Sequence, residues 1–258
     1  MLADSLGPHS HIMWVPRSPY TLLLVGGIVL SLVIWMRLAR REPRLVAIYF
    51  GALLGAFTGA KLVFLAAEGW LFWNSPDRWL IWATGKTILG ALLGGYGGVE
   101  IAKKVAGYSK PTGDLFAIVA PIGIILGRIG CLLHGCCLGQ VCKPHWWTLN
   151  DAQGLHRWPA VPFEIGFNGV AVVVFWLLRR KGVLPGQLFH LYLVAYGAFR
   201  FVHEFFRATP RISYGLSGYH VAALACIALG SWRFIQRQRD RSREFSSNPL
   251  RAVDLPHT

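Results

Sequence analysis

The stretch DLFAIVAPIGIILGRIGCLLHGCCLG, from Asp114 to Gly139, decides the class of the fold. Its first part is an apolar run ending near Leu133, about as long as one bilayer crossing, which needs roughly 20 residues. Its second part adds Arg128, His134 and cysteines where the run ends. Such a segment predicts a membrane helix with polar and thiol side chains gathered at one end.

The whole chain has the composition of a membrane protein. Of its 258 residues, 54% are hydrophobic and 15% are charged, whereas soluble domains carry about 25% charged residues. We expect an all-α polytopic membrane protein with about seven transmembrane helices, in one domain over residues 1–240. The apolar segments are Leu22–Met36, Leu45–Ala67, Thr87–Ala102, Leu115–Leu133, Pro162–Leu178, Gln187–Phe206 and Gly218–Phe234.

The positive charge is distributed as in a membrane protein rather than a nucleic-acid-binding protein. The formal net charge is +14, and lysine and arginine gather after the first, third, fifth and seventh apolar segments. Cytoplasmic loops carry this excess, so the pattern predicts an N-terminus outside and a C-terminus in the cytoplasm. Residues 241–258 form a basic polar tail that we expect to be disordered and to contact anionic lipid rather than nucleic acid.

Ionisable side chains inside the apolar segments are the first candidates for a substrate-binding site. Each costs about 2.5–3.5 kcal/mol on insertion scales, so its presence indicates a function. Lys61, Arg128 and Glu164 lie in the second, fourth and fifth segments. We therefore predict that these residues contribute to substrate binding.

The sixth segment contains YGAFRFVHEFFR, from Tyr196 to Arg207. Arg200, Glu204 and Arg207 are spaced i, i+4 and i+7, which places them on one helix face, with Tyr196 one turn before them. Arg200 and Glu204 could simply neutralise each other within the helix. Several guanidinium groups on one face also match the oxygens of a phosphate, and a phospholipid head group supplies that phosphate in a membrane.

Small residues predict close packing of two helices. Glycines recur every four positions at Gly51, Gly55 and Gly59, and the stretch GALLGGYGG repeats the pattern from Gly90 to Gly98. Such spacing lets helix backbones approach closely. Room for a lipid chain beside the backbone is the alternative interpretation.

Four cysteines lie within a short stretch that also contains His134. They are Cys131, Cys136, Cys137 and Cys142. Several interpretations compete: a structural disulfide such as Cys137 with Cys142, a metal site of thiolates and His134, reactive thiols, and inert packing. The spacing is not a pair of C-x-x-C units, which argues against the metal site and leaves the structural disulfide as the first interpretation.

The motifs resemble those of the bacterial prolipoprotein diacylglyceryl transferase family, from about Tyr20 to Trp232. GRIGCLLHGCCLG resembles the family pattern G-R-x-G-N-x-x-N-G-E-x-x-G without gaps, and YGAFRFVHEFFR resembles Y-G-x-x-R-F-x-x-E-x-x-R. PAVPFE is similar to P-[ST]-Q-L-Y-E, and GALLGAFTGAKL is similar to the second helix that ends in G-A-R-L.

The resemblance implies a multi-pass enzyme of the bacterial inner membrane without a cofactor. The family transfers the diacylglyceryl group of phosphatidylglycerol to the lipobox cysteine of a preprotein, forming a thioether and releasing glycerol phosphate. By position, Arg128 and Arg200 would hold the phosphate, and Glu204 would orient an arginine or the head group. Tyr196 and Gly139 complete the matched positions, and Arg207 adds a third guanidinium group.

The chain departs from the family pattern where the incoming thiol would be activated. The signature asparagine falls at Cys131, the signature glutamate at Cys136, and the histidine of the third helix at Leu89. A base is needed there, and His134 and His203 are the candidates to replace it, with Lys86 a poorer one. The alternatives are a transferase with another acceptor, a non-catalytic lipid-binding protein, or a membrane protein that uses its cysteines for thiol redox or metal binding.

Overall fold

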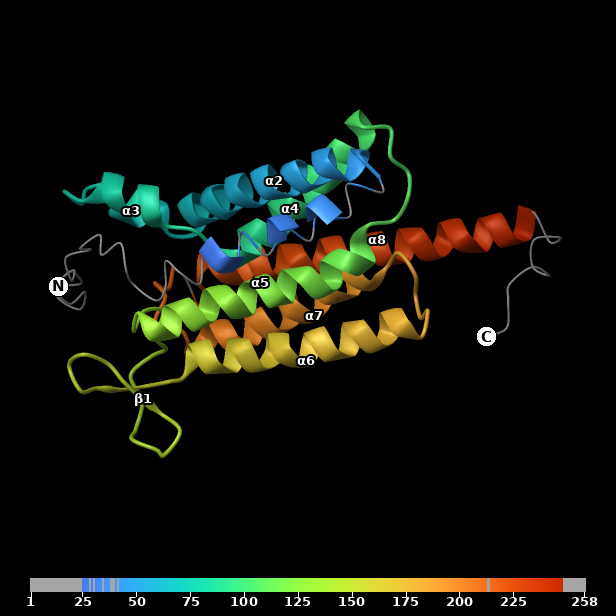
Figure 1. Ribbon diagram of the computed structural model, residues 1–258. Coiled ribbons are helices and arrows are strands. Elements are labelled where there is room, and N and C mark those ends of the chain that lie inside the picture. The colour runs from blue at the N-terminus through green and yellow to red at the C-terminus, as the bar shows by residue number, and fades with distance from the viewer. Residues whose placement is uncertain are drawn as a thin grey trace.

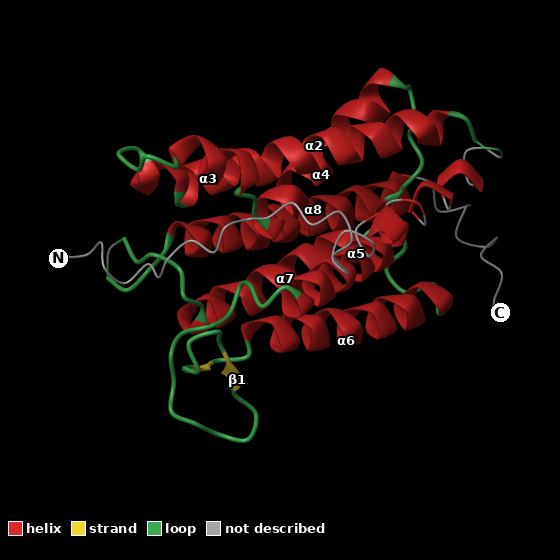
Figure 2. Ribbon diagram, turned by 60° about the vertical axis from the view of Figure 1, so that its left-hand side comes forward, coloured by secondary structure: helices red, strands yellow, loops and turns green. Residues whose placement is uncertain are grey.

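A computed structural model describes residues 25–27, 29, 31–33, 35–37, 40, 42–212 and 214–247. The described chain is a bundle of roughly antiparallel helices, with one small two-stranded hairpin at one end (Figure 1, Figure 2). The long helices are α2 (Arg44–Ala67), α4 (Ile88–Val105), α5 (Gly113–Leu133), α6 (Ala160–Arg180), α7 (Leu188–His203) and α8 (Gly218–Ser247). The short elements are η1 (Gly69–Phe72), α3 (Arg78–Thr84), β1 (Leu149–Asn150), β2 (His156–Arg157) and η2 (Glu204–Phe206).

The mostly helical membrane fold that the sequence predicts is confirmed. Among the described residues, four helical stretches are long and apolar enough to cross a membrane: Arg44–Ala67, Gly113–Leu133, Ala160–Arg180 and Gly218–Arg243. Helices α4 and α7 run alongside them in the same bundle (Figure 1, Figure 2). In the first predicted segment, Leu22–Met36, the described residues from 25 onward are helical as well. Residues 22–24 lie outside the described part.

The side chains are distributed as in a protein surrounded by lipid. Large apolar residues such as Leu54, Val170 and Val221 are 64–70% exposed on the outer faces of α2, α6 and α8. A few charged residues are instead buried between the helices, with Glu164 and Glu204 both at 0% exposure. An apolar exterior around a charged interior suits a bundle in hydrocarbon and not one in water.

Helices α2 and α4 pack backbone against backbone through their glycines. A Cβ atom added at Gly55 would lie 2.3 Å from the carbonyl oxygen of Gly94, and one added at Gly94 would lie 2.2 Å from that of Gly55. No side chain larger than hydrogen fits at either position. The predicted close approach of these helices is therefore confirmed.

Two helix ends differ from the prediction. The sixth apolar segment does not stay α-helical to Phe206, because α7 ends at His203 and continues as the tighter turn η2. The seventh segment continues past Phe234 to Ser247, so residues 241–247 of the predicted disordered tail are helical. The remainder of that tail, 248–258, lies outside the described residues.

Candidate functional site

Three helices bring charged side chains to one buried point. Arg128 from α5 forms an ion pair with Glu164 from α6, with Nη2 and Oε2 2.8 Å apart. Nη1 of Arg200, from α7, lies 3.8 Å from the same carboxylate oxygen. The hydroxyl of Tyr196 donates a hydrogen bond of 2.6 Å to Oε1 of Glu164. Glu164, with no exposed surface, is therefore the centre of the cluster.

A second carboxylate, Glu204, lies where α7 tightens into η2. It accepts a hydrogen bond of 2.7 Å from Nη2 of Arg200 and another of 2.7 Å from the hydroxyl of Thr209. The turn also brings Arg207 close, with Nε 3.8 Å from Glu204 and Nη1 3.7 Å from Glu164. The predicted neutralisation of Arg200 by Glu204 does occur, but two further arginines surround the same carboxylates.

We call Arg128, Arg200, Arg207, Glu164 and Glu204 the arginine cluster. Its three guanidinium groups face two carboxylates, so one positive charge has no counterpart within the cluster. In the described structure, Nε of all three arginines and Nη1 of Arg207 are buried without a hydrogen-bond acceptor. Buried donors without acceptors are rare in folded proteins and suit an anionic ligand with several oxygens.

The arginine cluster lies beside a large cavity of about 830 Å³. All three arginines line it, and so do Cys131, Cys136 and Cys137. Its wall includes both Gly113 and Cys131 of α5, which are separated by about 27 Å along an α-helix. Small and apolar residues such as Ala52, Ala56 and Gly95 line the middle. A charged end joined to a long apolar space suits a ligand with a phosphate head and acyl chains.

Lys61 does not join the arginine cluster. Its ammonium group donates hydrogen bonds to the carbonyl oxygens of Trp82, Ala83 and Gly85, at 2.5, 2.5 and 2.9 Å. These carbonyls lie at the C-terminal end of α3, where a helix lacks intrahelical donors and attracts a cation. The structure therefore places Lys61 in a capping role, away from the predicted substrate site.

Gly139 supports the site through the backbone. Its amide donates to the carbonyl oxygen of Trp158 at 3.0 Å, and it pairs with Arg207 in an isolated antiparallel bridge. A Cβ atom at this position would lie 2.5 Å from that Trp158 oxygen. A glycine here allows the loop after α5 to pack against the segment that carries Arg207.

The candidate bases lie in different surroundings. His203 is buried, stacks on Phe199 with ring centroids 4.9 Å apart, and has Nδ1 3.5 Å from Nη1 of Arg200. His134 is exposed at the end of α5. Leu89, which aligns with the family histidine, is 1% exposed and packs in the hydrophobic core.

The structure adds a carboxylate that sequence reasoning missed. Glu68 directly follows α2, lines the cavity, and accepts a hydrogen bond of 2.6 Å from the hydroxyl of Tyr219. Burial raises the pKa of Glu68, and the hydrogen bond from Tyr219 only partly offsets that. Its position in the sequence could have identified it, because Glu68 is the acidic residue immediately after the apolar run that ends at Ala67.

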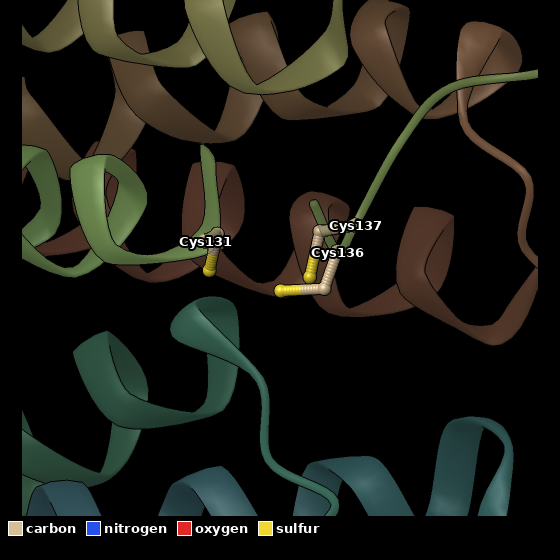
Figure 3. Close-up of side chains that lie close together, drawn as sticks. All are labelled: Cys131, Cys136 and Cys137. Carbon is tan, nitrogen blue, oxygen red and sulfur yellow. The ribbon is translucent and has the colours of Figure 1, made fainter. Parts of the chain in front are cut away.

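Three of the four clustered cysteines come together. The sulfur atoms of Cys131, Cys136 and Cys137 all lie within 4.8 Å of one another, at the end of α5 (Figure 3). Cys142 is not part of this group; its amide donates to the carbonyl oxygen of His156 beside the hairpin. All the cysteines belong to the described part of the chain and carry free thiols, so the predicted pairing of Cys137 with Cys142 is absent there.

The three thiols are not equivalent. Hydrogen bonds from Cys131 and Cys136 lower the pKa of Cys137, and the nearby charges of Arg128 and Arg207 act in the same direction. The corresponding hydrogen bonds raise the pKa of Cys136. Of these two thiols, Cys137 therefore loses its proton more readily than Cys136.

Known proteins resemble this chain over most of its length. Residues 10–236 match the family model described as prolipoprotein diacylglyceryl transferase. A phosphatidylglycerol–prolipoprotein diacylglyceryl transferase of Dehalococcoides mccartyi is 31% identical over 70% of this chain and 72% of its own length. Enzymes of the same name from Pseudoalteromonas atlantica and Cupriavidus metallidurans are 30% and 28% identical, covering 79% and 80% of this chain and 74% and 80% of their own lengths. The chain therefore belongs to the prolipoprotein diacylglyceryl transferase family, a family of membrane-embedded transferases.

Proposed function

We propose that this protein transfers the diacylglyceryl group of phosphatidylglycerol to the cysteine thiol of a lipobox-bearing preprotein. The observation that carries the proposal is the set of unpaired guanidinium N–H groups of Arg128, Arg200 and Arg207, which line one end of a long cavity. The names of the relatives, which specify phosphatidylglycerol and prolipoprotein, support the choice of substrates.

The charge of the arginine cluster suits this reaction. A phosphodiester carries one negative charge, equal to the positive charge that Glu164 and Glu204 leave uncompensated. When the thiol sulfur bonds to the glyceryl carbon, the carbon–oxygen bond breaks and the leaving glycerol phosphate gains negative charge. Fixed guanidinium donors stabilise that developing charge without reorganising, which is the usual source of electrostatic catalysis.

The roles of the other predicted residues follow from their contacts. Glu164 and Glu204 hold Arg128 and Arg200 in place, and Tyr196 fixes Glu164. Gly139 places the segment of Arg207. His203, next to Arg200, is a positioning group rather than a base in this scheme, because it is not among the residues that line the cavity. His134 is exposed at the end of α5.

We propose a multi-pass arrangement in the bacterial inner membrane, with seven spans and the N-terminus outside. The distribution of basic residues supports this orientation, because the α4–α5 and α6–α7 connections lie at one end of the bundle (Figure 1) and carry Lys110 and Lys181, and Lys103 lies in the last turn of α4. The arginine cluster and the thiols are near the opposite, outer end, where a secreted preprotein would arrive.

A transfer assay tests the function. Purified protein in detergent is incubated with phosphatidylglycerol and a lipobox peptide, and mass spectrometry detects the diacylglyceryl adduct. We expect the adduct to form, and Arg128→Ala and Arg200→Ala to reduce the rate at least 100-fold. Arg179→Ala, which changes an exposed arginine of α6, is the matched control and should leave the rate unchanged.

The result also discriminates between acceptors. Full turnover in both Arg128→Ala and Arg200→Ala would contradict the proposed site. If phosphatidylglycerol binds tightly but the lipobox peptide is never modified, the acceptor is a different nucleophile or the protein only binds lipid.

A further inference from the structure

The loop after α5 is shaped so that three thiols face one point. Cys131 lies in the last turn of α5, and the chain then reverses through Gly135 and Cys137, whose φ angles are +68° and +62°. A non-glycine residue in the left-handed region costs roughly 1–3 kcal/mol, and such strain is concentrated at ligand sites. Figure 3 shows the three sulfur atoms on the same side of the helix end, facing the neighbouring α4 segment.

The distances suit one metal ion. Two thiolates on a tetrahedral zinc ion, each bound at about 2.3 Å, are about 3.8 Å apart. The three sulfur atoms already lie within 4.8 Å of one another, so small side-chain rotations suffice to close the site. Soft thiolate ligands select thiophilic ions such as zinc over magnesium or calcium.

We propose that Cys131, Cys136 and Cys137 bind one thiophilic metal ion of the zinc class, with an open coordination position facing the cavity. Binding zinc requires that the three thiols release their protons. The group of potential metal ligands found among the described residues contains these three side chains and no fourth. Three protein ligands plus one open position is the arrangement of catalytic zinc rather than of structural zinc.

The surrounding charge supports an anionic complex. Zinc with three thiolates carries one negative charge, and the same cavity is lined by Arg128, Arg200 and Arg207. These guanidinium groups attract an anionic metal complex, and the one positive charge left over in the arginine cluster is the same charge that a bound phosphate would offset. Cys131 and Cys136 occupy the positions where the family pattern has asparagine and glutamate, so this chain gains the metal ligands where it loses those side chains.

The open position can hold the acceptor thiol; this part rests on the proposed function. The lipobox thiol replaces a water molecule on the ion and loses its proton to solvent, since a coordinated thiol is deprotonated. The bound thiolate then attacks the glyceryl carbon, a sulfur–carbon bond forms, and glycerol phosphate leaves with the electron pair of the broken carbon–oxygen bond. The metal would thereby replace the base that is missing at Leu89, where the family resemblance implies a site without a cofactor.

Metal binding is tested first, without reference to activity. The full-length protein is purified in detergent and its zinc and copper are measured by mass spectrometry, as isolated and after incubation with Zn²⁺. Wild type should bind one equivalent. Cys131→Ser, Cys136→Ser and Cys137→Ser should each weaken binding by more than the roughly 10–100-fold typical of losing a residue that only orients a ligand. Cys142→Ser and Cys226→Ser, which change cysteines outside the group, should bind as wild type.

A second measurement uses wild type alone, so that it does not depend on whether a variant folds. Free thiols are labelled with a maleimide in the presence and absence of Zn²⁺, and labelled peptides are identified by mass spectrometry. Zinc should protect Cys131, Cys136 and Cys137 and leave Cys142 reactive. Cadmium in place of zinc should give a sulfur-to-metal charge-transfer band that the three serine variants lose.

The outcomes separate the two parts of the proposal. Absence of bound metal together with equal labelling in both conditions would overturn the metal site, whatever the transfer assay shows. If zinc is bound, if its removal by a chelator abolishes transfer, and if added Zn²⁺ restores transfer, both the metal site and its role in holding the acceptor thiol are supported. Bound zinc with transfer that survives its removal overturns the acceptor role alone. Bound zinc without any transfer contradicts the proposed function and leaves the metal site standing.

Discussion

Arg128 and Glu164 form an ion pair of 2.8 Å between α5 and α6, and their side chains are only 9% and 0% exposed. Glu164 also faces Arg200 and Arg207 within 3.8 Å. A single carboxylate therefore offsets charge from three guanidinium groups that the helices hold together. This relationship makes Glu164 a structural requirement for the site and separates its role from that of the arginines.

Replacing Glu164 by alanine should destabilise the protein by about 3–5 kcal/mol, because a buried ion pair broken on one side leaves uncompensated charge. Glu164→Gln should cost less, since it keeps an acceptor for the hydroxyl of Tyr196. Thermal or denaturant unfolding in detergent measures both. The matched control is Glu100→Gln, whose pair with Arg233 is more than a quarter exposed and should contribute no more than about 1 kcal/mol. If Glu164→Ala and Glu100→Gln lost the same amount of unfolding free energy, this account would be wrong.

Arg207→Gln should separate stability from function. The Nε and Nη1 atoms of Arg207 have no hydrogen-bond acceptor in the described structure, and its nearest carboxylate oxygens are 3.7 and 3.8 Å away. Removing it also removes the excess positive charge of the arginine cluster. We expect a smaller loss of unfolding free energy than for Glu164→Ala, because Glu164 and Glu204 keep Arg128 and Arg200 as partners, while diacylglyceryl transfer falls roughly 100-fold. A variant that unfolds but transfers normally when folded would show that Arg207 acts in folding instead.

Gly94→Leu should disrupt the packing of α2 on α4. Any Cβ at Gly94 would lie 2.2 Å from the carbonyl oxygen of Gly55, and backbone cannot move aside as a side chain can. We expect a loss of several kcal/mol, above the roughly 1–3 kcal/mol typical of overpacking. Gly97→Leu is the control on the same helix, because a Cβ there meets nothing within 4 Å. Similar unfolding temperatures of the two variants, measured in detergent, would contradict the backbone contact.

The parts of the fold and site that followed from sequence are those with a large energetic cost. A charge in an apolar segment is expensive, so Arg128, Glu164 and Arg200 could be recognised as candidate site residues before their contacts were known. The glycine spacing of α2 and α4 was equally informative, since close helix packing excludes larger residues. The positions of the long apolar helices followed from hydropathy, but four helices of the described part are long and apolar enough to cross a membrane, so seven spans stay a prediction. Two helix ends differed as well, because α7 ends in η2 and α8 continues to Ser247.

The features of the site that the sequence did not predict depend on which residues lie nearest to each other in space. Lys61 is as costly in an apolar segment as Arg128, yet it caps α3, and insertion energy does not specify the partner. Cys142 is close in sequence to the other cysteines, but the hairpin carries it away from them. Glu68 was missed because it falls one residue outside the apolar run, where a carboxylate is ordinarily solvated.

The carboxyl group of Glu68 should make stability depend on pH. Burial raises its pKa above the ordinary value of 4.5, so the folded state binds more protons than the unfolded state in this range. Folding stability should therefore fall as the pH rises from about 4.5 through the raised pKa, and stay constant above it. Glu68→Gln cannot titrate, so the unfolding temperature of wild type should fall relative to that of this variant as the pH rises across that window.

Tyr219→Phe should enlarge this pH-dependent fall, because the hydroxyl of Tyr219 hydrogen-bonds the carboxylate at 2.6 Å and favours its charged form. Thermal unfolding in detergent between about pH 4 and pH 8 measures all three proteins, and a difference that is independent of pH would show that Glu68 is solvated in the folded state.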